Sequence, residues 1–373
     1  MHITHLYWSL CYGGIETMLV NIANTQAMLG EKVSIIIIND KYEESLVKSI
    51  NPNIGLYFLN RKESSKDISF ILKLNILLGK LQPDIIHTHC SDITKILRSK
   101  YIKRLCTTIH SLPYGPVKNG NIFKEFTRKF SGSKRVKSNV ECLDKIPYIF
   151  SISNAVKQML LDNYGMNSVI IPNGIITKRF SVAKSDTPKI PLRIIMVSRL
   201  EHEKKGQDLL IEAAAKLKGI VTVDLIGVGP SMEYLKELTQ KFSAENIIHF
   251  LGKQTQDYIA SHLADYDLFI QPSRWEGFGL TVAEAMSARV PVLVSEGQGP
   301  AEVTCGNKYG WTFTNGDVND LIEKIIYIIK YYNEAIKKAE TARQYVINTY
   351  DVSVTAKKYI EEYRKIFKSS HSK

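Results

Sequence analysis

The sequence lacks the features that mark several large protein classes. Its five cysteines are scattered along 373 residues and show no C-x-x-C or zinc-finger spacing, which favours reduced thiols in a cytosolic protein. Met1 leads directly into an apolar segment without a signal-peptide pattern, and no apolar run reaches the roughly 18 residues of a membrane-spanning helix. The G-x-G-x-x-G fingerprint is also absent, which disfavours nicotinamide or flavin binding. We therefore expect a soluble or peripheral protein without a cofactor.

Acidic residues are too few to balance the basic ones. The chain has 49 Lys and Arg against 37 Asp and Glu, a net charge of +12, but no helix-turn-helix, RRM or zinc pattern points to nucleic acid as the partner. Positive charge is concentrated at 118–137, where three phenylalanines recur at helical spacing. Such a stretch fits an anionic membrane surface or a lipid diphosphate, but equally a solvated helix whose phenylalanines face the core. The basic residues assigned to this possible membrane or acceptor patch are Lys124, Arg128, Lys129, Lys134, Arg135 and Lys137.

The length suits two domains of roughly 180 residues, each with its own core. Apolar runs alternate with helical patterns almost throughout, which predicts parallel sheets with crossover helices. The predicted strands are 2–7, 33–38, 55–59, 84–88, 105–109, 148–151, 169–171, 192–197, 220–226, 247–251, 267–271 and 290–294. The predicted helices are 14–29, 67–80, 93–103, 153–163, 206–218, 231–242, 254–264, 279–288, a longer helix or pair at 320–347, and 352–367.

A polar segment divides this pattern. Residues 173–190 are rich in Ser, Thr, Lys and Pro and are predicted to be the linker between a first domain at 1–172 and a second at 191–351. Within 320–347, a buried stripe is expected at Ile322, Ile325, Ile326 and Ile329.

The most informative segment is QPSRWEGFGLTVAEAM, from Gln271 to Met286. An apolar strand ends at Pro272, a glycine-bearing turn follows, and a helix is predicted to begin near Gly279. Two glutamates, Glu276 and Glu284, separated by seven residues, bracket this turn. Either glutamate alone would be explained as a solvated loop residue or a helix cap, but the complete string is more specific.

This arrangement favours a nucleotide-activated sugar as ligand. A helix that begins at Gly279 or Leu280 has unpaired backbone N–H groups and a dipole that attract a diphosphate. Gly277 and Gly279 allow the backbone to approach a ligand closely. Glu284 lies four residues beyond Leu280 on the same helix face, where it can receive two ribose hydroxyls. Glu276 lies on the loop, where positive charge develops as a glycosidic bond to the diphosphate breaks. Phe278 and Thr281 complete the set assigned to donor binding.

Three further sites can approach an anion. Gly13 and Gly14 precede the first long helix and leave its N-terminus open, although an ordinary tight turn would look the same. Arg199 follows the first strand of the second domain, and Lys205 precedes Gly206 and the next helix. Because strand ends of an open α/β sheet face the ligand crevice, these two cations are placed to neutralise a diphosphate. Lys204 is adjacent, and the choice of Lys205 rests on its position directly before the glycine.

The segment resembles the retaining glycosyltransferases of family four, whose signature includes two glutamates at this spacing followed by Ala-Met or a similar pair. The resemblance covers most of the chain. It implies an α/β protein of the GT-B fold, with two Rossmann-like domains facing across a cleft. It also implies that the C-terminal helix, at 352–373, crosses back to the first domain. The first domain would then be the acceptor side, and the second would bind the nucleotide sugar.

The resemblance also implies roles for several residues. Gly13 and Gly14 would approach the donor diphosphate, and Arg199 and Lys205 would hold it. His110 is similar to the family histidine that reaches the donor sugar, and we expect a polar contact from it, with a core or loop histidine as the alternative. His87 and His89 share one strand face, but the sequence shows no third metal ligand of suitable spacing. GT-B transferases generally work without a divalent metal, so no metal is expected.

These expectations define a function and its alternatives. We predict a retaining hexosyltransferase-type enzyme that moves a sugar from a nucleotide-sugar donor, a UDP- or GDP-sugar, to a saccharide or lipid-linked acceptor. The setting implied is bacterial polysaccharide or lipopolysaccharide synthesis, in the cytoplasm or at the inner face of its membrane. The alternatives are a sugar-nucleotide 2-epimerase of the same fold and a non-catalytic sugar-nucleotide-binding protein. No second carboxylate is identifiable as a nucleophile, so the retaining mechanism stays open.

Overall fold

The structure is a computed structural model that describes residues 1–11, 13–111, 142–180, 187–188 and 190–371. The chain divides into two compact units. The first holds residues 1–110, 116–174 and 352–373, and the second holds 111–115 and 175–351. The domain boundaries predicted from the sequence were 172, 191 and 351, with a linker between the first two.

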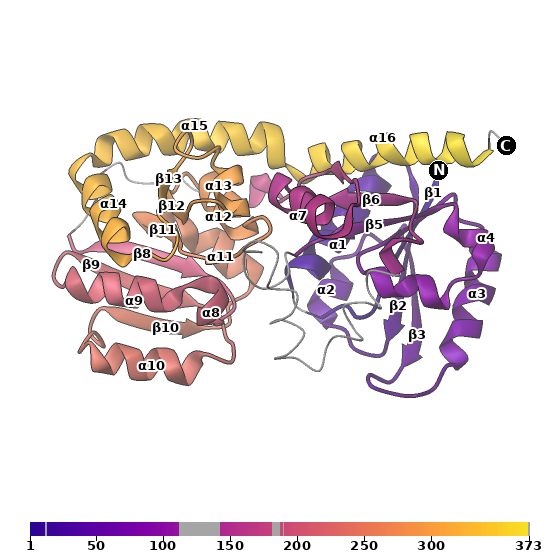
Figure 1. Cartoon of the computed structure of the whole chain (residues 1–373), viewed down its shortest axis with the longest axis horizontal. Helices are drawn as coiled ribbons and strands as arrows, with labels where there is room; N and C mark the ends of the chain where they lie inside the picture. Colours follow the sequence, from indigo (N-terminus) through magenta and orange to yellow (C-terminus); the bar gives the residue numbers. More distant parts are fainter. Residues whose placement is uncertain (12, 112–141, 181–186, 189, 372–373) are drawn as a thin grey trace. The chain divides into compact units, whose positions relative to one another are not determined.

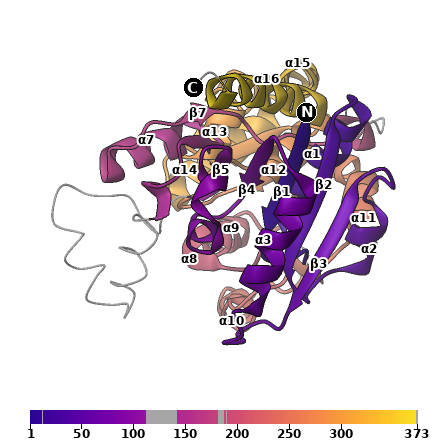
Figure 2. The ribbon, with the colours of Figure 1, turned by 90° about the vertical axis from the view of Figure 1, so that its right-hand side faces the viewer.

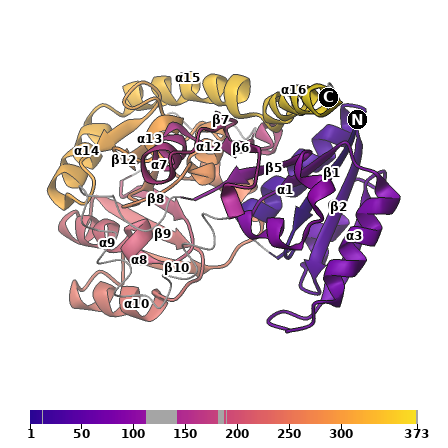
Figure 3. The same cartoon turned by 45° about the vertical axis from the view of Figure 1, so that its right-hand side comes forward.

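The first unit is built on a parallel sheet of seven strands in the order β3-β2-β1-β4-β5-β6-β7 (Figure 1). Its strands are β1 (His2–Tyr7), β2 (Lys32–Asn39), β3 (Gly55–Arg61), β4 (Ile85–Thr88), β5 (Leu105–Ile109), β6 (Tyr148–Ser151) and β7 (Val169–Ile170). Its helices are α1 (Gly14–Met28), α2 (Glu44–Lys48), α3 (Ser69–Leu81), η1 (Ser91–Ile96), α4 (Ser99–Ile102), α7 (Asn154–Tyr164) and α16 (Val352–His371). Figure 3 shows β1 and β2 side by side, as their parallel pairing requires.

Helix α16 belongs to the first unit although it is the last element of the chain. Ala356, Tyr359 and Tyr363 are fully buried along one of its faces. The hydroxyl of Tyr359 lies 2.8 Å from Thr108 Oγ1, and that of Tyr363 lies 2.6 Å from His87 Nδ1. Two buried polar groups of the sheet are therefore satisfied by side chains more than 240 residues away in the sequence.

The second unit is built on a parallel sheet of six strands in the order β10-β9-β8-β11-β12-β13. Its strands are β8 (Leu192–Val197), β9 (Val221–Ile226), β10 (Ile248–Gly252), β11 (Leu268–Gln271), β12 (Val292–Ser295) and β13 (Trp311–Phe313). The helices are η2 (Thr177–Phe180), α8 (His202–Lys205), α9 (Gln207–Lys216), α10 (Met232–Lys241), α11 (Gln256–His262), η3 (Leu263–Asp265), α12 (Leu280–Ser287), α13 (Gly299–Val303), α14 (Val318–Lys330) and α15 (Tyr332–Tyr350). Helices α9, α10 and α14 pack together in one layer, while α12 packs against α13, α15 and η2.

The observed architecture agrees with the predicted α/β class, and three local predictions were wrong. The helix expected at 93–103 is split into η1 and α4, because buried Asn75 binds the carbonyl of Ile96 and the amide of Arg98 (2.8 and 3.0 Å) in place of helical partners. The second error is an omission, because no helix was predicted at Gly299–Val303, where the structure has α13.

The third error concerns α14, whose predicted stripe included Ile326. That side chain is 47% exposed, whereas Leu321, Ile325 and Ile328 are fully buried. The long segment also resolves into the pair α14 and α15. The apolar residues of α14 are so numerous that the sequence alone did not fix which face turns inward.

Part of the predicted linker is packed structure. Ile175 and Phe180 are buried, and η2 packs on α12, where Ser287 Oγ donates to the carbonyl of Thr177 (3.1 Å). The segment therefore begins the second unit.

Candidate functional site

The predicted donor residues of the second unit gather where its strand order reverses. Strand β8 pairs with β9 on one side and β11 on the other, so the chain leaves their carboxyl ends in opposite directions. Such a switch point in an open α/β sheet is the usual location of a ligand crevice. The segment after β8 carries Arg199 and Lys205, and the segment after β11 carries Glu276.

The backbones of these two segments lie close together. Gly206 has a φ of +71°, and a Cβ added there would lie 2.0 Å from the carbonyl oxygen of Pro272. The amide of Arg274 donates to the carbonyl of Lys204 (2.9 Å). A side chain at Gly206 would push the two segments apart, so glycine is required there for Lys205 and Glu276 to approach each other.

The loop before α12 is braced by Arg274. Its guanidinium forms a bidentate ion pair with Asp208 (2.9 and 2.7 Å) and also donates to the carbonyl of His202 (2.8 Å). The Asp208 carboxylate holds the pKa of Arg274 above its ordinary value. Asn315 donates to the Arg274 carbonyl (2.9 Å), so the loop is held from two directions. Two parallel charged hydrogen bonds fix geometry better than a single contact does.

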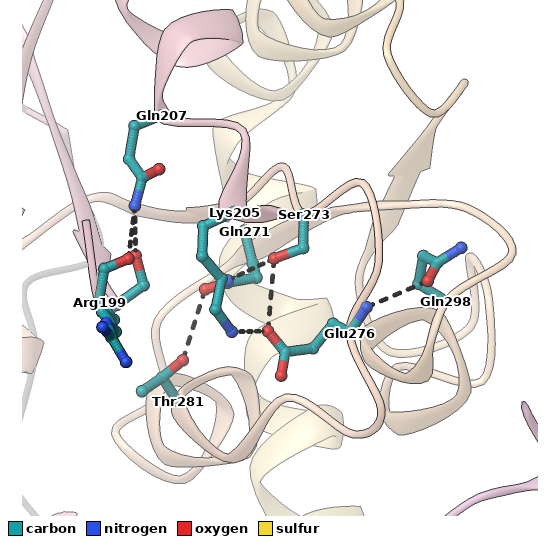
Figure 4. Close-up of polar contacts among 9 residues, drawn as sticks. Arg199, Lys205, Gln207, Gln271, Ser273, Glu276, Thr281 and Gln298 are labelled. Atoms are coloured by element: carbon teal, nitrogen blue, oxygen red, sulfur yellow. Dashed lines mark hydrogen bonds and ion pairs between the residues drawn. The ribbon is translucent and has the colours of Figure 1, made fainter. Parts of the chain in front are cut away.

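Glu276 is the centre of a network of polar contacts (Figure 4). Its carboxylate forms an ion pair with the ammonium of Lys205, and Ser273 Oγ lies 3.5 Å from the same carboxylate oxygen. Gln271 donates to Ser273 (2.7 Å), and the Glu276 amide donates to Gln298 Oε1 (3.1 Å). Ser273 and Gln271 are almost fully buried, whereas the Glu276 side chain keeps 19% of its surface exposed. The carboxylate is thus oriented by buried groups and remains accessible.

Helix α12 begins at Leu280, as the sequence predicts, with Gly279 as its N-cap at a φ of +100°. Thr281 Oγ1 lies 3.4 Å from Gln271 Oε1, which joins the first turn to the network around Glu276. Phe278 is 4% exposed and packs edge-on against Tyr350, with ring centroids 5.4 Å apart. Its side chain therefore belongs to the core, and only the backbone of Gly277, Phe278 and Gly279 is suited to meeting a ligand.

Glu284 is buried on α12, with 7% of its surface exposed. Burial raises the pKa of its carboxyl to about 7, although the positive charge of Arg179 opposes the shift. A carboxyl with that pKa is half protonated at neutral pH when no ligand is bound. Arg179 lies in η2, within the predicted linker, and was not among the predicted site residues.

The cations at the site differ in their burial and in their partners. Arg199 is exposed, and its carbonyl, rather than its guanidinium, accepts a hydrogen bond from Gln207 (2.9 Å; Figure 4). Lys205 is partly buried and paired with Glu276. Lys204 contributes its carbonyl to the loop, and burial lowers the pKa of its side chain. The two adjacent lysines thus contribute different groups to the site, because the Lys205 ammonium is paired with Glu276 whereas the Lys204 carbonyl holds the loop.

In the first unit, Gly13 is the N-cap of α1 and Gly14 its first residue. The side chain of Glu16 folds back over this end, so that a Cβ on Gly13 would lie 2.3 Å from a Glu16 carboxylate oxygen. Burial raises the pKa of Glu16. A phosphate approaching this helix end would meet the Glu16 carboxyl, which would have to be protonated or move aside.

His110 is half-buried at the end of β5 and belongs to a group of four histidines. Its Nε2 lies 3.0 Å from His89 Nδ1, and burial lowers the pKa of His110 to about 3. The imidazole is therefore neutral at pH 7, which suits a polar contact and does not suit a cation.

His5 adds a third histidine beside His87 and His89, and the sequence analysis missed it. His5 on β1 pairs in register with His87 on β4, and one nitrogen from each of the three rings lies within 4.8 Å of the others. In the present arrangement both His87 nitrogens are bonded, to Thr108 and Tyr363. Burial lowers the pKa of His5 to about 4 and that of His89 well below its ordinary range. The set forms a buried network of neutral rings.

The basic residues predicted as a membrane or acceptor patch, Lys124 to Lys137, lie outside the described residues. No helix in the described part of the chain is long and apolar enough to cross a membrane.

Comparison with known proteins identifies the family. The sequence profile described as Glycosyltransferase Family 4 matches residues 12–179, and the one described as Glycosyl transferases group 1 matches residues 177–348. The chain belongs to glycosyltransferase family 4. Its two parallel sheets with helices match the GT-B glycosyltransferase fold, as the sequence analysis expected.

Relatives of this glycosyltransferase span most of its length. The gpi3 subunit of phosphatidylinositol N-acetylglucosaminyltransferase from Schizosaccharomyces pombe is 23% identical, over 91% of the chain and 74% of that protein. The lipopolysaccharide 1,6-galactosyltransferase of Salmonella typhimurium is 23% identical, over 87% of the chain and 89% of that protein. Among solved structures, Anabaena HepE in complex with UDP and glucose aligns with a TM-score of 0.79 at 21% identity, covering 98% of this chain and 100% of that one.

Proposed function

We propose that this glycosyltransferase transfers a sugar from a UDP- or GDP-sugar to a saccharide or lipid-linked saccharide, with retention of anomeric configuration. The observation that carries the proposal is the Lys205–Glu276 pair beside the start of α12, at the switch point of the second sheet. A cation, an accessible carboxylate and the first amides of a helix, joined by one network of polar contacts, match the charges of a sugar diphosphate.

In the proposed mechanism, the diphosphate lies against the first turn of α12, with Lys205 and Arg199 compensating its charge. Glu276 then faces the sugar ring, where its negative charge stabilises the positive charge that develops at the anomeric carbon. The bond from this carbon to the diphosphate oxygen breaks, and the acceptor oxygen bonds to the same face. The acceptor's proton passes to the leaving diphosphate. Glu284 holds the ribose hydroxyls, and His110, as a neutral imidazole, contacts a sugar hydroxyl.

The mechanism assigns no role to a divalent metal. Lys205 and Arg199 supply fixed positive charge where a metal ion would otherwise neutralise the leaving group. We therefore expect turnover to continue in the presence of EDTA, measured as release of the nucleotide diphosphate. Loss of turnover in EDTA and its recovery with Mg²⁺ or Mn²⁺ would contradict this part of the proposal.

The names of related proteins support the setting. Relatives include a lipopolysaccharide galactosyltransferase and glycosyltransferases of colanic acid biosynthesis. We infer a role in cell-surface polysaccharide synthesis, on the cytoplasmic side of the membrane. HepE was crystallised with UDP and with UDP-glucose, which makes UDP-sugars the first donors to test.

The deciding experiment measures nucleotide release. The full chain is incubated with UDP-, GDP- and ADP-sugars, with and without a lipid extract as acceptor. We expect release of UDP or GDP that depends on the acceptor. Conversion of the donor to its epimer without acceptor would instead identify a sugar-nucleotide 2-epimerase, and thermal stabilisation by a nucleotide without turnover would identify a binding protein.

A further inference from the structure

Helix α3 presents an apolar face to solvent. Ile68, just before its first turn, is 71% exposed, and Leu72 and Ile76 are 58% and 48% exposed. Because these residues are four positions apart, they form one stripe along the helix. The opposite side is buried against the sheet through Phe70, Leu74 and Leu78. Figure 2 shows α3 at the front of the first unit, with no other described element of that unit drawn over it.

Basic side chains border this stripe. Lys73 and Lys80 lie beside it on α3, are exposed, and form no ion pair with a described residue. The neighbouring segment of η1 and α4 is held against α3 by Asn75, which binds the carbonyl of Ile96 (2.8 Å). That segment adds more exposed cations, at Lys95, Arg98, Lys100 and Lys103. From 61 to 104 the chain has ten Lys and Arg against four Asp and Glu, a difference of +6.

The apolar stripe and the cations around it fit an anionic bilayer better than a second copy of the chain or another protein. A second copy of the chain would bring the same positive charge against itself, which disfavours pairing of two such faces. The stripe spans eight residues, about 12 Å of helix, and is too short for a stable protein interface of roughly 800 Å² per partner. An anionic bilayer provides negative charge for the lysines and a shallow apolar layer for the three side chains.

We propose that α3 with the adjoining η1–α4 segment is a docking surface for an anionic membrane. Ile68, Leu72 and Ile76 enter the boundary between headgroups and acyl chains, while Lys73 and Lys80 contact lipid phosphates. The residues of this surface differ from those of the basic stretch at 118–137. It goes beyond the proposed transferase activity, because binding to a vesicle requires neither donor nor acceptor.

The test is sedimentation of the full chain with lipid vesicles. Vesicles of phosphatidylcholine with about one third phosphatidylglycerol are compared with vesicles of phosphatidylcholine alone. The variant Ile68→Ser/Leu72→Ser/Ile76→Ser removes the stripe. The control Met28→Ser/Ile326→Ser/Tyr327→Ser removes side chains of similar exposure elsewhere, at 70%, 47% and 45%. A second variant, Lys73→Ala/Lys80→Ala, removes charge beside the stripe.

We expect the wild type to bind the anionic vesicles only, and the control to bind like the wild type. The stripe variant should bind anionic vesicles about tenfold more weakly than the wild type. The charge variant should also lose on the order of tenfold in affinity, and this loss should be smaller at high salt, which screens the lysines. Circular dichroism and the melting temperature check that each variant is folded. Unchanged vesicle binding by the folded stripe variant would overturn the proposal. So would concentration-dependent dimers, detected by light scattering, that the stripe substitutions abolish without any vesicle binding by the wild type.

Discussion

In both units the strand order reverses at a central pair of strands, β8 and β11 in the second unit and β1 and β4 in the first. The polar groups near this point are charged in the second unit and uncharged in the first. In the second unit, the ends of β8 and β11 carry a charged pair, Lys205 and Glu276, that keeps contact with solvent. In the first unit, the neighbouring strands β1 and β4 carry His5 and His87, which are fully buried and neutral. One sheet thus has fixed charge in the segments that follow its central strands, and the other has uncharged hydrogen-bonding groups within its central strands.

The charged groups of the second unit and the neutral groups of the first suit different parts of a substrate. Charge located at the second unit suits a diphosphate, whose affinity depends on cations and helix amides. In the first unit, the half-buried ring of His110 suits a hydroxyl group, because a neutral imidazole can donate or accept a hydrogen bond without a counter-ion. The bracing of the charged loop by Arg274 and Asp208 fixes its geometry before any ligand arrives.

The largest effect is expected from Glu276→Ala, which removes the carboxylate of the charged site. Turnover should fall roughly 10²–10³-fold, because the carboxylate acts on charge that appears only in the transition state. Affinity for UDP should be kept or increased, since Lys205 loses its internal partner. Nucleotide release and titration calorimetry measure the two quantities. Equal turnover in Glu276→Ala and wild type would refute the assigned role.

Lys205→Ala should weaken UDP binding by about 10- to 150-fold, the equivalent of roughly 1.5–3 kcal/mol for a charge-assisted contact. The adjacent Lys204→Ala is the matched control, because Lys204 holds the loop through its backbone carbonyl, which the substitution leaves in place. Calorimetric titration with UDP compares the two. If Lys204→Ala lost more affinity than Lys205→Ala, the choice between these lysines would be reversed.

The neutral site should make the protein sensitive to acid. The pKa of His5 is lowered to about 4 in the folded state, from about 6.5 in the unfolded chain. Between these values the unfolded chain binds more protons, so stability falls as pH decreases from 6.5 towards 4. His5→Gln should reduce that slope by at most about 1.4 kcal/mol per pH unit.

Melting temperatures measured from pH 7.5 to about 4.5 follow this effect. Wild type and His5→Gln are compared at each pH. A slope in His5→Gln equal to that of the wild type would show that His5 does not contribute.

The smallest effect concerns Glu284, whose pKa is about 7 without ligand. Only the ionised carboxylate accepts both ribose hydroxyls, so UDP affinity should rise about tenfold between pH 6 and pH 8. In Glu284→Gln the rise should disappear, and any pH dependence left over belongs to the phosphate. An identical profile in both proteins would remove Glu284 from the ribose site.

The order of strands and helices was predictable because each buried strand of a parallel sheet is a short apolar run bounded by polar turns. The start of α12 was predictable from Gly279. Contacts between distant residues were not. Asn75, which splits the predicted helix at 93–103, acts across more than 20 residues.

The same limit applies to the site. The pairing of Arg274 with Asp208 spans 66 residues and leaves no local pattern. His5 joins His87 only because β1 and β4 are neighbours in the sheet. Arg179 was assigned to a linker, since its surroundings are rich in Ser, Thr and Lys and gave no sign of packing.

The first unit combines N-terminal segments with the helix α16, and this order of its parts affects how it folds during synthesis. Its sheet is complete in sequence by Gly174, yet Thr108 and His87 find their tyrosine partners only in the final helix. During synthesis, Tyr359 and Tyr363 are made after every strand of the first sheet. We therefore expect nascent chains halted before α16 to leave the first sheet open to proteases, even after the second unit has closed around its own core.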